Sequence, residues 1–150
     1  MTDSSGTAER AARVRESFAR QGLMATLGAT LGKVEPGVVE IAVTPTPAIS
    51  QQHGFVHGGA VSAIADTAAG YAAVSLMPPG TAALTTELKI NFIAPASGER
   101  IVARAEVVKA GRTLTVVQTN VFAETAGVRK LIALLVATIM TLEAKGGFSD

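Results

Sequence analysis

Hydrophobic and polar residues alternate along much of the second half of the chain. Leu88, Ile90 and Phe92, for example, alternate with Glu87, Lys89 and Asn91. A period of two is typical of β-strands, because successive side chains of a strand point to opposite faces of the sheet. Short links join these segments, and short links are typical of antiparallel neighbours. Four long strands are predicted in this half, over residues 87–92, 101–108, 113–124 and 128–142.

The first half of the chain has a helical period. Ala11, Val14 and Phe18 are spaced as on one face of a helix, which predicts a short amphipathic helix over residues 8–21. Residues 39–43 alternate as a strand does. A second helix of small residues is predicted over 58–76, since Pro78, Pro79 and Gly80 follow it closely.

The order of these elements predicts an α+β fold in one domain of 150 residues. The helix over 58–76 is apolar on nearly every face, so other elements must surround it. An antiparallel sheet of long strands can wrap around such a helix. Its remaining apolar surface calls for a partner, which predicts a homodimer. Residues 1–6 and 145–150 are expected to be disordered tails.

Composition excludes several kinds of function. The charges nearly balance, 13 basic against 12 acidic, and aromatics make up 4%, so nothing indicates a nucleic-acid partner. Cysteine is absent, which excludes disulfides, thiolate metal sites and a cysteine nucleophile. Residues 1–21 lack the apolar core of a secretory signal, and a cytoplasmic location is therefore expected. Residues 58–77 have membrane-helix length, but a central aspartate costs roughly 2.5–3.5 kcal/mol on insertion scales, which argues against a span.

Asp66 is the most informative residue of the chain. No other carboxylate and no lysine or arginine lies between Val56 and Thr86. Aspartate is a poor residue for a helix interior, and ionised carboxylates are rarely buried without a partner. Such acids cluster at functional sites, which makes Asp66 a candidate catalytic residue. Its alternative role is that of a buried acid satisfied by Ser or Thr hydroxyls across an interface.

Gly58 and Gly59 stand where the long helix begins. The first N–H groups of a helix lack partners within it, and together with the helix dipole they suit a developing oxyanion. The alternative is that the two glycines only allow tight packing at the start of the helix. Asp66 lies eight residues after Gly58, about 12 Å along the axis, and points to a different side from His57. One bound carbonyl cannot touch both ends, so a shared site would have to lie between two subunits.

The segment Gln51-Gln52-His53-Gly54-Phe55-Val56-His57-Gly58-Gly59, followed after six residues by Asp66, resembles the signature of hotdog-fold acyl-CoA thioesterases. The nearest group is the phenylacetic-acid-degradation (PaaI) type, whose third-strand pattern resembles residues 84–96. The resemblance covers residues 27–142. It implies a hotdog fold, in which an antiparallel sheet wraps around one long central helix, here with a short N-terminal helix.

The resemblance also implies roles for five residues. Gly58 would polarise the thioester carbonyl through its backbone N–H, and His57 would shape the helix entry. Asp66 of the opposing subunit would act as general base on water or as nucleophile. Thr85 would position the water or the acid, and Gln51 would hold the water or the thioester in a place where an Asn is commoner.

The expected reaction is hydrolysis of an aromatic or medium-chain acyl-CoA to the free acid and coenzyme A. The substrate would be held by Gly59 and, at its phosphates, by Lys109 and Arg112. No cofactor and no metal are expected, although His53 and His57 with Asp66 form a weaker metal-site alternative. The expected assembly is a dimer that pairs into a tetramer. The alternatives are a non-catalytic module that binds acyl-CoA or acyl-carrier protein, and a hotdog dehydratase or hydratase, whose helix would carry a catalytic His that is missing here.

Overall fold

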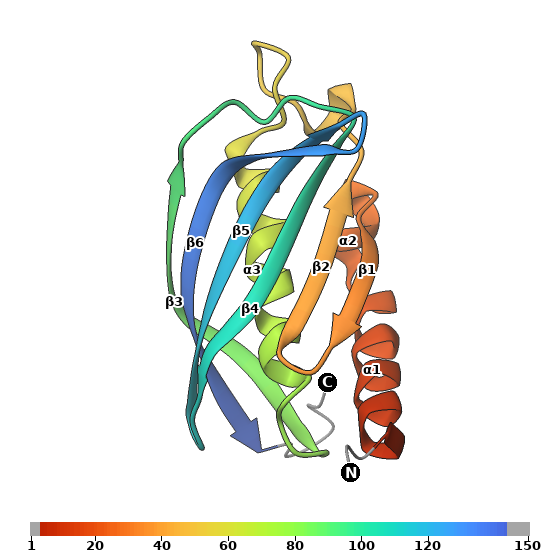
Figure 1. Ribbon diagram of the computed structural model, residues 1–150, viewed down its shortest axis with the longest axis vertical. Coiled ribbons are helices and arrows are strands. Elements are labelled where there is room, and N and C mark those ends of the chain that lie inside the picture. Colours follow the sequence, from red (N-terminus) through yellow and green to blue (C-terminus); the bar gives the residue numbers. More distant parts are fainter. Residues whose placement is uncertain (1–3, 144–150) are drawn as a thin grey trace.

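The computed structural model describes residues 4–143, and its centre is one long helix held inside a curled antiparallel sheet (Figure 1). The helix, α3 (Gly58–Val74), contacts five of the six strands. The strands, in sheet order, are β1 (Thr30–Glu35), β2 (Val38–Val43), β4 (Arg100–Ala110), β5 (Leu114–Thr125), β6 (Val128–Glu143) and β3 (Thr81–Phe92). Two further helices, α1 (Ser4–Ala19) and α2 (Gly22–Leu27), lie beside β1. The predicted α+β hotdog fold is confirmed.

Small side chains allow the sheet to close around α3. Ten residues of the helix are buried, and six of them are alanines. The buried residues are Ala60, Val61, Ile64, Ala65, Ala68, Ala69, Tyr71, Ala72, Ala73 and Val74. Because alanine projects little beyond the backbone and has the highest helix propensity, the strands can approach the helix without weakening it.

The carboxyl end of α3 is tied to the N-terminal helix. Carbonyl groups at a helix end lack partners within the helix and carry the negative end of its dipole. The Arg13 guanidinium donates hydrogen bonds to the carbonyl oxygens of Pro78 at 2.8 Å and Met77 at 3.0 Å, and also to that of Val74. Arg13 therefore holds α1 in place by supplying donors that the helix end requires.

The two faces of the sheet differ in polarity, as the period of two requires. Along β5, Val117, Thr119 and Val121 are buried towards α3, and Thr119 donates to the carbonyl oxygen of Ala65 at 3.2 Å. Gln118 and Asn120 lie between them on the opposite face. The alternation therefore determines which side of each strand faces the helix.

The structure differs from the sequence prediction near the N-terminus. Helix α1 begins at Ser4, inside the segment expected to be a disordered tail, because the good helix formers that follow extend the helix towards the N-terminus. Helix α2 was not predicted, since six residues are too few to show a period, and it ends at Gly28 in the left-handed conformation. Residues 1–3 and 145–150 lie outside the described part of the chain.

The described helices include none that is both long enough and apolar enough to span a membrane.

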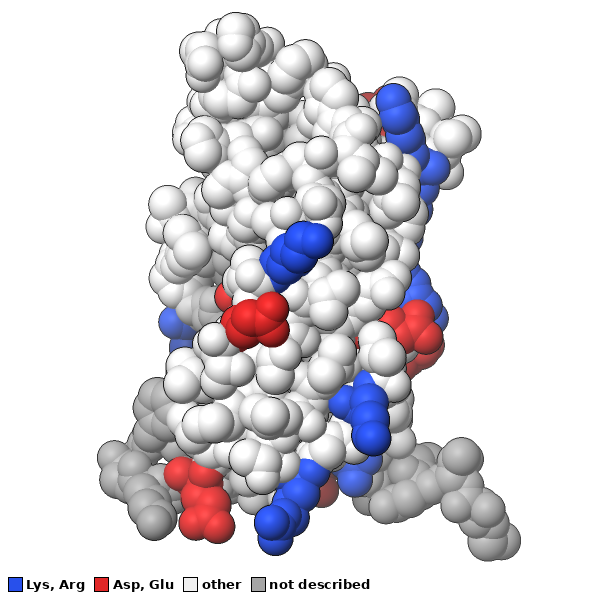
Figure 2. Space-filling view, turned by 90° about the vertical axis from the view of Figure 1, so that its left-hand side faces the viewer, with Lys and Arg blue, Asp and Glu red and all other residues white. Residues whose placement is uncertain are grey.

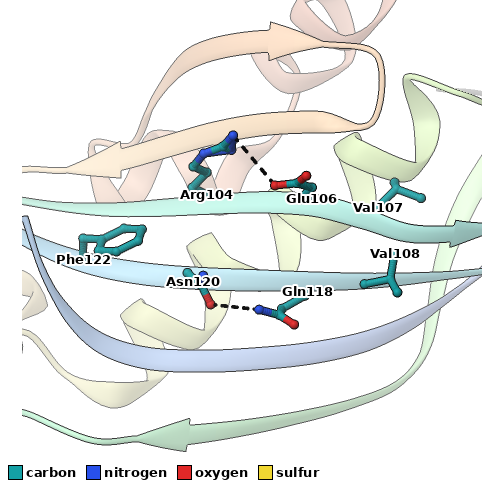
Figure 3. A pocket seen from close by; sticks show the side chains of 7 residues that line it. All are labelled: Arg104, Glu106, Val107, Val108, Gln118, Asn120 and Phe122. Carbon is teal, nitrogen blue, oxygen red and sulfur yellow. Dashed lines mark hydrogen bonds and ion pairs between the residues drawn. The ribbon is translucent and has the colours of Figure 1, made fainter.

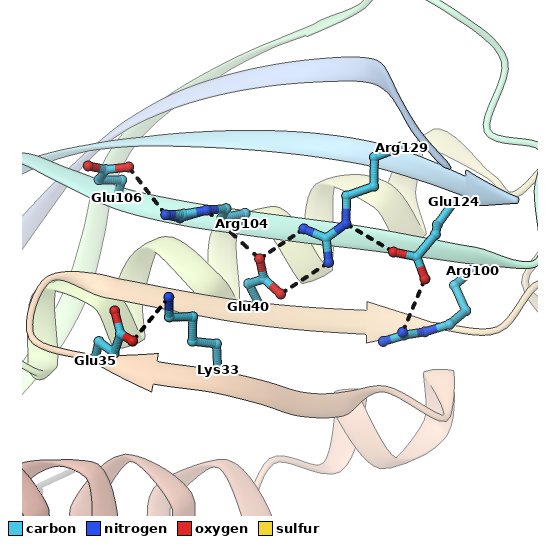
Figure 4. A network of polar contacts seen from close by, with 8 residues as sticks. All are labelled: Lys33, Glu35, Glu40, Arg100, Arg104, Glu106, Glu124 and Arg129. Atoms are coloured by element: carbon cyan, nitrogen blue, oxygen red, sulfur yellow. Dashed lines mark hydrogen bonds and ion pairs between the residues drawn. The ribbon is translucent and has the colours of Figure 1, made fainter. Parts of the chain in front are cut away.

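Charged side chains gather in pairs on the outer face of the sheet (Figure 4). Arg129 contacts Glu40 at 3.0 Å and Glu124 at 2.9 Å, and Arg104 approaches Glu40 at 3.8 Å. The Arg129 hydrogen bond is the main reason why the pKa of Glu40 lies below its usual value. The network links β2, β4, β5 and β6 across their outer face.

We predict that Glu40→Gln weakens the fold in a pH-dependent manner. A carboxyl whose pKa is lower in the folded state stabilises the protein above its unfolded pKa, and this contribution is lost as the pH falls through the folded value. Near pH 7 the variant should lose about 0.5–1 kcal/mol of unfolding free energy. At about pH 3.5, below the ordinary glutamate value, the difference should shrink. Urea unfolding at both pH values measures it, with the exposed Glu35→Gln as control. An equal loss at both pH values would contradict the prediction.

Candidate active site

Asp66 lies in the middle of α3, half-buried, with its carboxylate directed at the edge strand β3. The hydroxyl of Thr85 donates a hydrogen bond to Oδ1 of Asp66 at 2.8 Å. The pairing of β3 with β6 shifts register immediately after Thr85, and such bulges re-aim side chains. Among the described residues, no cation pairs with Asp66 and no donor reaches Oδ2. One carboxylate oxygen is therefore oriented and the other is available.

An open groove of about 300 Å³ runs along α3 past this carboxylate. Besides Asp66 and Thr85, it is lined by residues of α3, of β3 and of the N-terminal segment: Gln21, Leu23, Thr67, Gly70, Tyr71, Val74 and Ala83. Thr67 and Gly70 were not identified from the sequence, because no motif distinguishes them from the other small residues of the helix. Gln21 was not identified either, because nothing local indicates that the N-terminal segment reaches α3.

The amino end of α3 leaves a single N–H group available. His57 is the N-cap residue, and its Nδ1 accepts a hydrogen bond from the Gly59 N–H at 2.7 Å. The carbonyl oxygen of His57 accepts from Ala60 and Val61 at 2.9 and 3.1 Å. No acceptor among the described residues takes the N–H of Gly58. Of the two glycines predicted to contact the substrate, Gly58 therefore has a backbone N–H available. The N–H of Gly59 already donates to the His57 side chain.

The helix entry is closely packed at both glycines. A Cβ at Gly59 would stand 2.9 Å from Nδ1 of His57, which would break the cap. A Cβ at Gly58 would stand 3.2 Å from the ring of Phe92. The two glycines thus allow the cap to form and the ring of Phe92 to pack against the helix entry.

Gln51 lies at the same end of the helix as Gly58. A second pocket, of about 210 Å³, is lined by Gln51, Gly58, Val61 and Phe92, among others. The backbone N–H of His53 donates to Oε1 of Gln51 and orients the side-chain amide. Within one chain the candidate residues therefore form two groups, Gln51 with His57 and Gly58 at the helix entry, and Asp66 with Thr85 further along.

Lys109 and Arg112 flank the turn between β4 and β5 and are exposed. This turn lies beside Thr141, whose N–H donates to the carbonyl oxygen of Thr113, at the end of the sheet where β3 begins. Gly58 packs beside Phe92, where β3 ends. Within one chain the two cations are therefore far from the helix entry.

A hollow of about 370 Å³ on the outer face of the sheet contains none of the predicted site residues (Figure 3). Gln118 donates to Asn120 at 3.3 Å and Arg104 pairs with Glu106 at 3.8 Å, while Nη1 of Arg104 is buried without a hydrogen-bond partner among the described residues. In the described part of the chain, no three His, Asp or Glu side chains come close enough together to hold a metal ion.

Comparison with known proteins relates this arrangement to one superfamily. The model of the thioesterase superfamily matches residues 53–130, which include the helix entry, Asp66 and Thr85. A thioesterase family protein from Silicibacter pomeroyi has 51% sequence identity and a TM-score of 0.87, over 89% of this chain and 98% of its own. The 1,4-dihydroxy-2-naphthoyl-CoA hydrolase of Listeria monocytogenes is 27% identical over 79% of this chain and 94% of its own. The E. coli PaaI protein shares the fold, with a TM-score of 0.82 and 23% identity, over 96% of this chain and 99% of its own.

We predict that His57→Ala destabilises the protein by about 1 kcal/mol, because the Gly59 N–H loses its acceptor at the helix entry. His57→Asn should recover most of this loss, since asparagine is a good N-cap residue. His53→Ala is the matched control, because the side chain of His53 is exposed and caps no helix. Urea unfolding measures all three, and equal stability of His57→Ala and His53→Ala would contradict the capping role.

Proposed function

The chain belongs to the thioesterase superfamily and is a thioester hydrolase, and on this premise we propose that its substrates are acyl-CoA thioesters. The observation that carries the proposal is the pair of half-sites, an available N–H at Gly58 and an oriented carboxylate at Asp66. A relative of similar length is named as a hydrolase of an aromatic acyl-CoA, which supports coenzyme A as the leaving group. An aromatic or medium-chain acyl group is proposed.

We propose that two subunits join along β3 to complete the site. Strand β3 is a long strand at one edge of the sheet, and such an edge presents unpaired backbone groups to a second chain. Leu84, Leu88 and Phe92 are 47%, 40% and 53% exposed along it. Away from its right-hand edge, the upper part of the face on this side carries no charged side chain, and a basic and an acidic side chain lie next to each other near its middle (Figure 2). A second copy of this strand is the simplest partner, since pairing of the two copies gives hydrogen-bond partners to the backbone groups of both edge strands at once.

The positions of the half-sites along β3 support this pairing. Thr85, beside Asp66, and Phe92, beside Gly58, lie seven residues apart on the strand. An antiparallel pair with its two-fold axis near Leu88 and Lys89 places Thr85 of one strand opposite the partner subunit's Phe92. The same axis brings Asp66 to the level of the partner subunit's Gly58. It also brings Lys109 and Arg112 to the end where the partner subunit's helix begins.

The proposed chemistry uses these residues directly. The N–H of Gly58, at the positive end of the helix dipole, polarises the thioester carbonyl and stabilises the oxyanion. The ionised Asp66 of the other subunit either removes a proton from water or attacks the carbonyl carbon, and Thr85 holds the carboxylate in place. If Asp66 acts as base, water adds to the carbonyl carbon and coenzyme A leaves as a thiolate, which needs little help from an acid. If Asp66 attacks the carbon itself, the thiolate leaves behind a mixed anhydride, and water then hydrolyses this anhydride to the free acid and the Asp66 carboxylate. The proposed reaction requires no cofactor.

Other residues have supporting roles in the proposal. Gln51 lines the pocket at Gly58 and holds the water or the thioester, and His57 fixes the geometry of the helix entry. Lys109 and Arg112 are proposed to bind the phosphates of coenzyme A. Pairing of dimers into a tetramer and a cytoplasmic location remain predictions.

We predict that Asp66→Asn lowers the turnover of acyl-CoA at least about 100-fold, because the amide can neither accept a proton nor attack carbon. Release of free thiol from a panel of aromatic and aliphatic acyl-CoAs measures turnover, and calorimetric titration with coenzyme A measures retained binding. Glu35→Gln, which removes an exposed carboxylate of β1 at the opposite edge of the sheet, is the matched control and should keep full activity. If wild type binds acyl-CoA without hydrolysing any, the chain is a binding module.

We predict that two inactive variants restore activity in a mixed dimer if the site is shared. Gly58→Pro removes the N–H at the first helical position, where proline is tolerated, and His57 already has the extended backbone that precedes proline. A mixed dimer of Gly58→Pro and Asp66→Asn has one intact site and should show about half the wild-type activity. The parent variants are first checked for folding and dimerisation, and a mixed dimer without activity would contradict a shared site.

A further inference from the structure

Gly70 is an unexplained residue in the interior of α3. Glycine is among the least favourable residues in a helix interior. Its φ angle is negative, so the backbone does not require glycine there. A Cβ built at Gly70 would meet nothing within 4 Å, so no neighbour within the chain excludes a side chain either. The missing side chain therefore leaves space for something outside the chain.

That space belongs to the groove at Asp66. Gly70 lies one helical turn after Asp66, on the same face of α3, roughly 6 Å further along the axis. The wall opposite consists of Ala83 on β3, another small residue. Gly70 and Ala83 thus leave room between α3 and β3 beyond the carboxylate, where an elongated apolar group can lie against the helix.

The far end of the groove is formed by the N-terminal segment. Leu23, in α2, lines the groove and is 56% exposed. The side-chain amide of Gln21 donates to the hydroxyl of Tyr71 at 3.0 Å, and this hydroxyl also lies 3.1 Å from that of Ser17. These bonds fasten the beginning of α2 to α3. Residues 21–23 precede the part of the chain that the superfamily model matches, so this wall lies outside the matched region.

We infer that the acyl group of the substrate lies in this groove, running from Asp66 over Gly70, and that Gly70 and Leu23 limit the length it can have. The inference rests on the proposed function and specifies the substrate class. A groove of about 300 Å³ is at the small end of ligand pockets, which fits a single ring or a medium-length chain.

The test compares acyl-chain profiles of purified enzymes by thiol release, using acyl-CoAs from two to sixteen carbons and benzoyl-CoA. Gly70→Leu should lower kcat/KM for octanoyl-CoA and benzoyl-CoA about 10-fold or more, with acetyl-CoA changed about 2-fold or less, because the new side chain fills the groove beyond Asp66. Leu23→Ala should shift the preference towards longer chains. Leu114→Ala, a leucine on β5 with 49% exposure, is the matched control and should leave the profile unchanged.

Each outcome separates the acyl groove from the alternatives. A uniform fall in kcat/KM for all chain lengths, or an unchanged profile in both variants, would overturn the inference. Dissociation of the Gly70→Leu dimer in sedimentation would also overturn it, because the space would then belong to the second copy. If the Gly70→Leu variant does not fold, Gly70→Ala tests the same inference. Alanine should raise the Tm by about 3 °C, because it has a higher helix propensity than glycine. It should lower activity only on the longest acyl chains that the wild type accepts. Failure of wild type to hydrolyse any acyl-CoA would instead contradict the proposed function.

Discussion

The enclosure of α3 by a single sheet is the constraint on which the rest of this molecule depends. A helix that is buried on most sides can expose polar backbone groups only at its ends. The carboxyl end is closed by Arg13 and the amino end by His57, and the N–H of Gly58 has no acceptor within residues 4–143. A binding group for a developing negative charge is therefore a consequence of how the helix is enclosed.

The same enclosure determines where a carboxylate can lie on the helix. Most of α3 faces the tightly packed interior of the sheet, where an ionised group would be costly. Asp66 faces β3, the edge strand, where the covering is thinnest and the hydroxyl of Thr85 provides a hydrogen bond. The acid is partly shielded from water and still accessible from the open side. The ion pairs of Glu40 with Arg104 and Arg129, and of Arg129 with Glu124, lie on the outer face of the sheet, away from this site.

Separation of the two half-sites within one chain would give the proposed dimer a chemical role. About 12 Å of helix lie between Gly58 and Asp66, which is too far for both to contact one carbonyl group. A two-fold axis across β3 removes this separation without any change in the subunit. In this arrangement the edge strand serves both as the surface that joins the subunits and as a wall of the site, so assembly and catalysis depend on the same residues.

The sequence by itself determined the features that depend on neighbouring residues. The strand alternation from Leu88 to Phe92, the small-residue helix, its glycine entry and the isolated Asp66 were all predicted, because period and composition are local properties. Only the tertiary structure decided which groups meet. The bond from Thr85 to Asp66, the pairing of Glu40 with Arg129 and the contact of Gln21 with Tyr71 join residues that are distant in the chain. Such contacts depend on strand register and on the packing of α1 and α2, which no local pattern encodes. The capture of the Gly59 N–H by His57 is local, but it depends on a side-chain orientation that composition does not reveal.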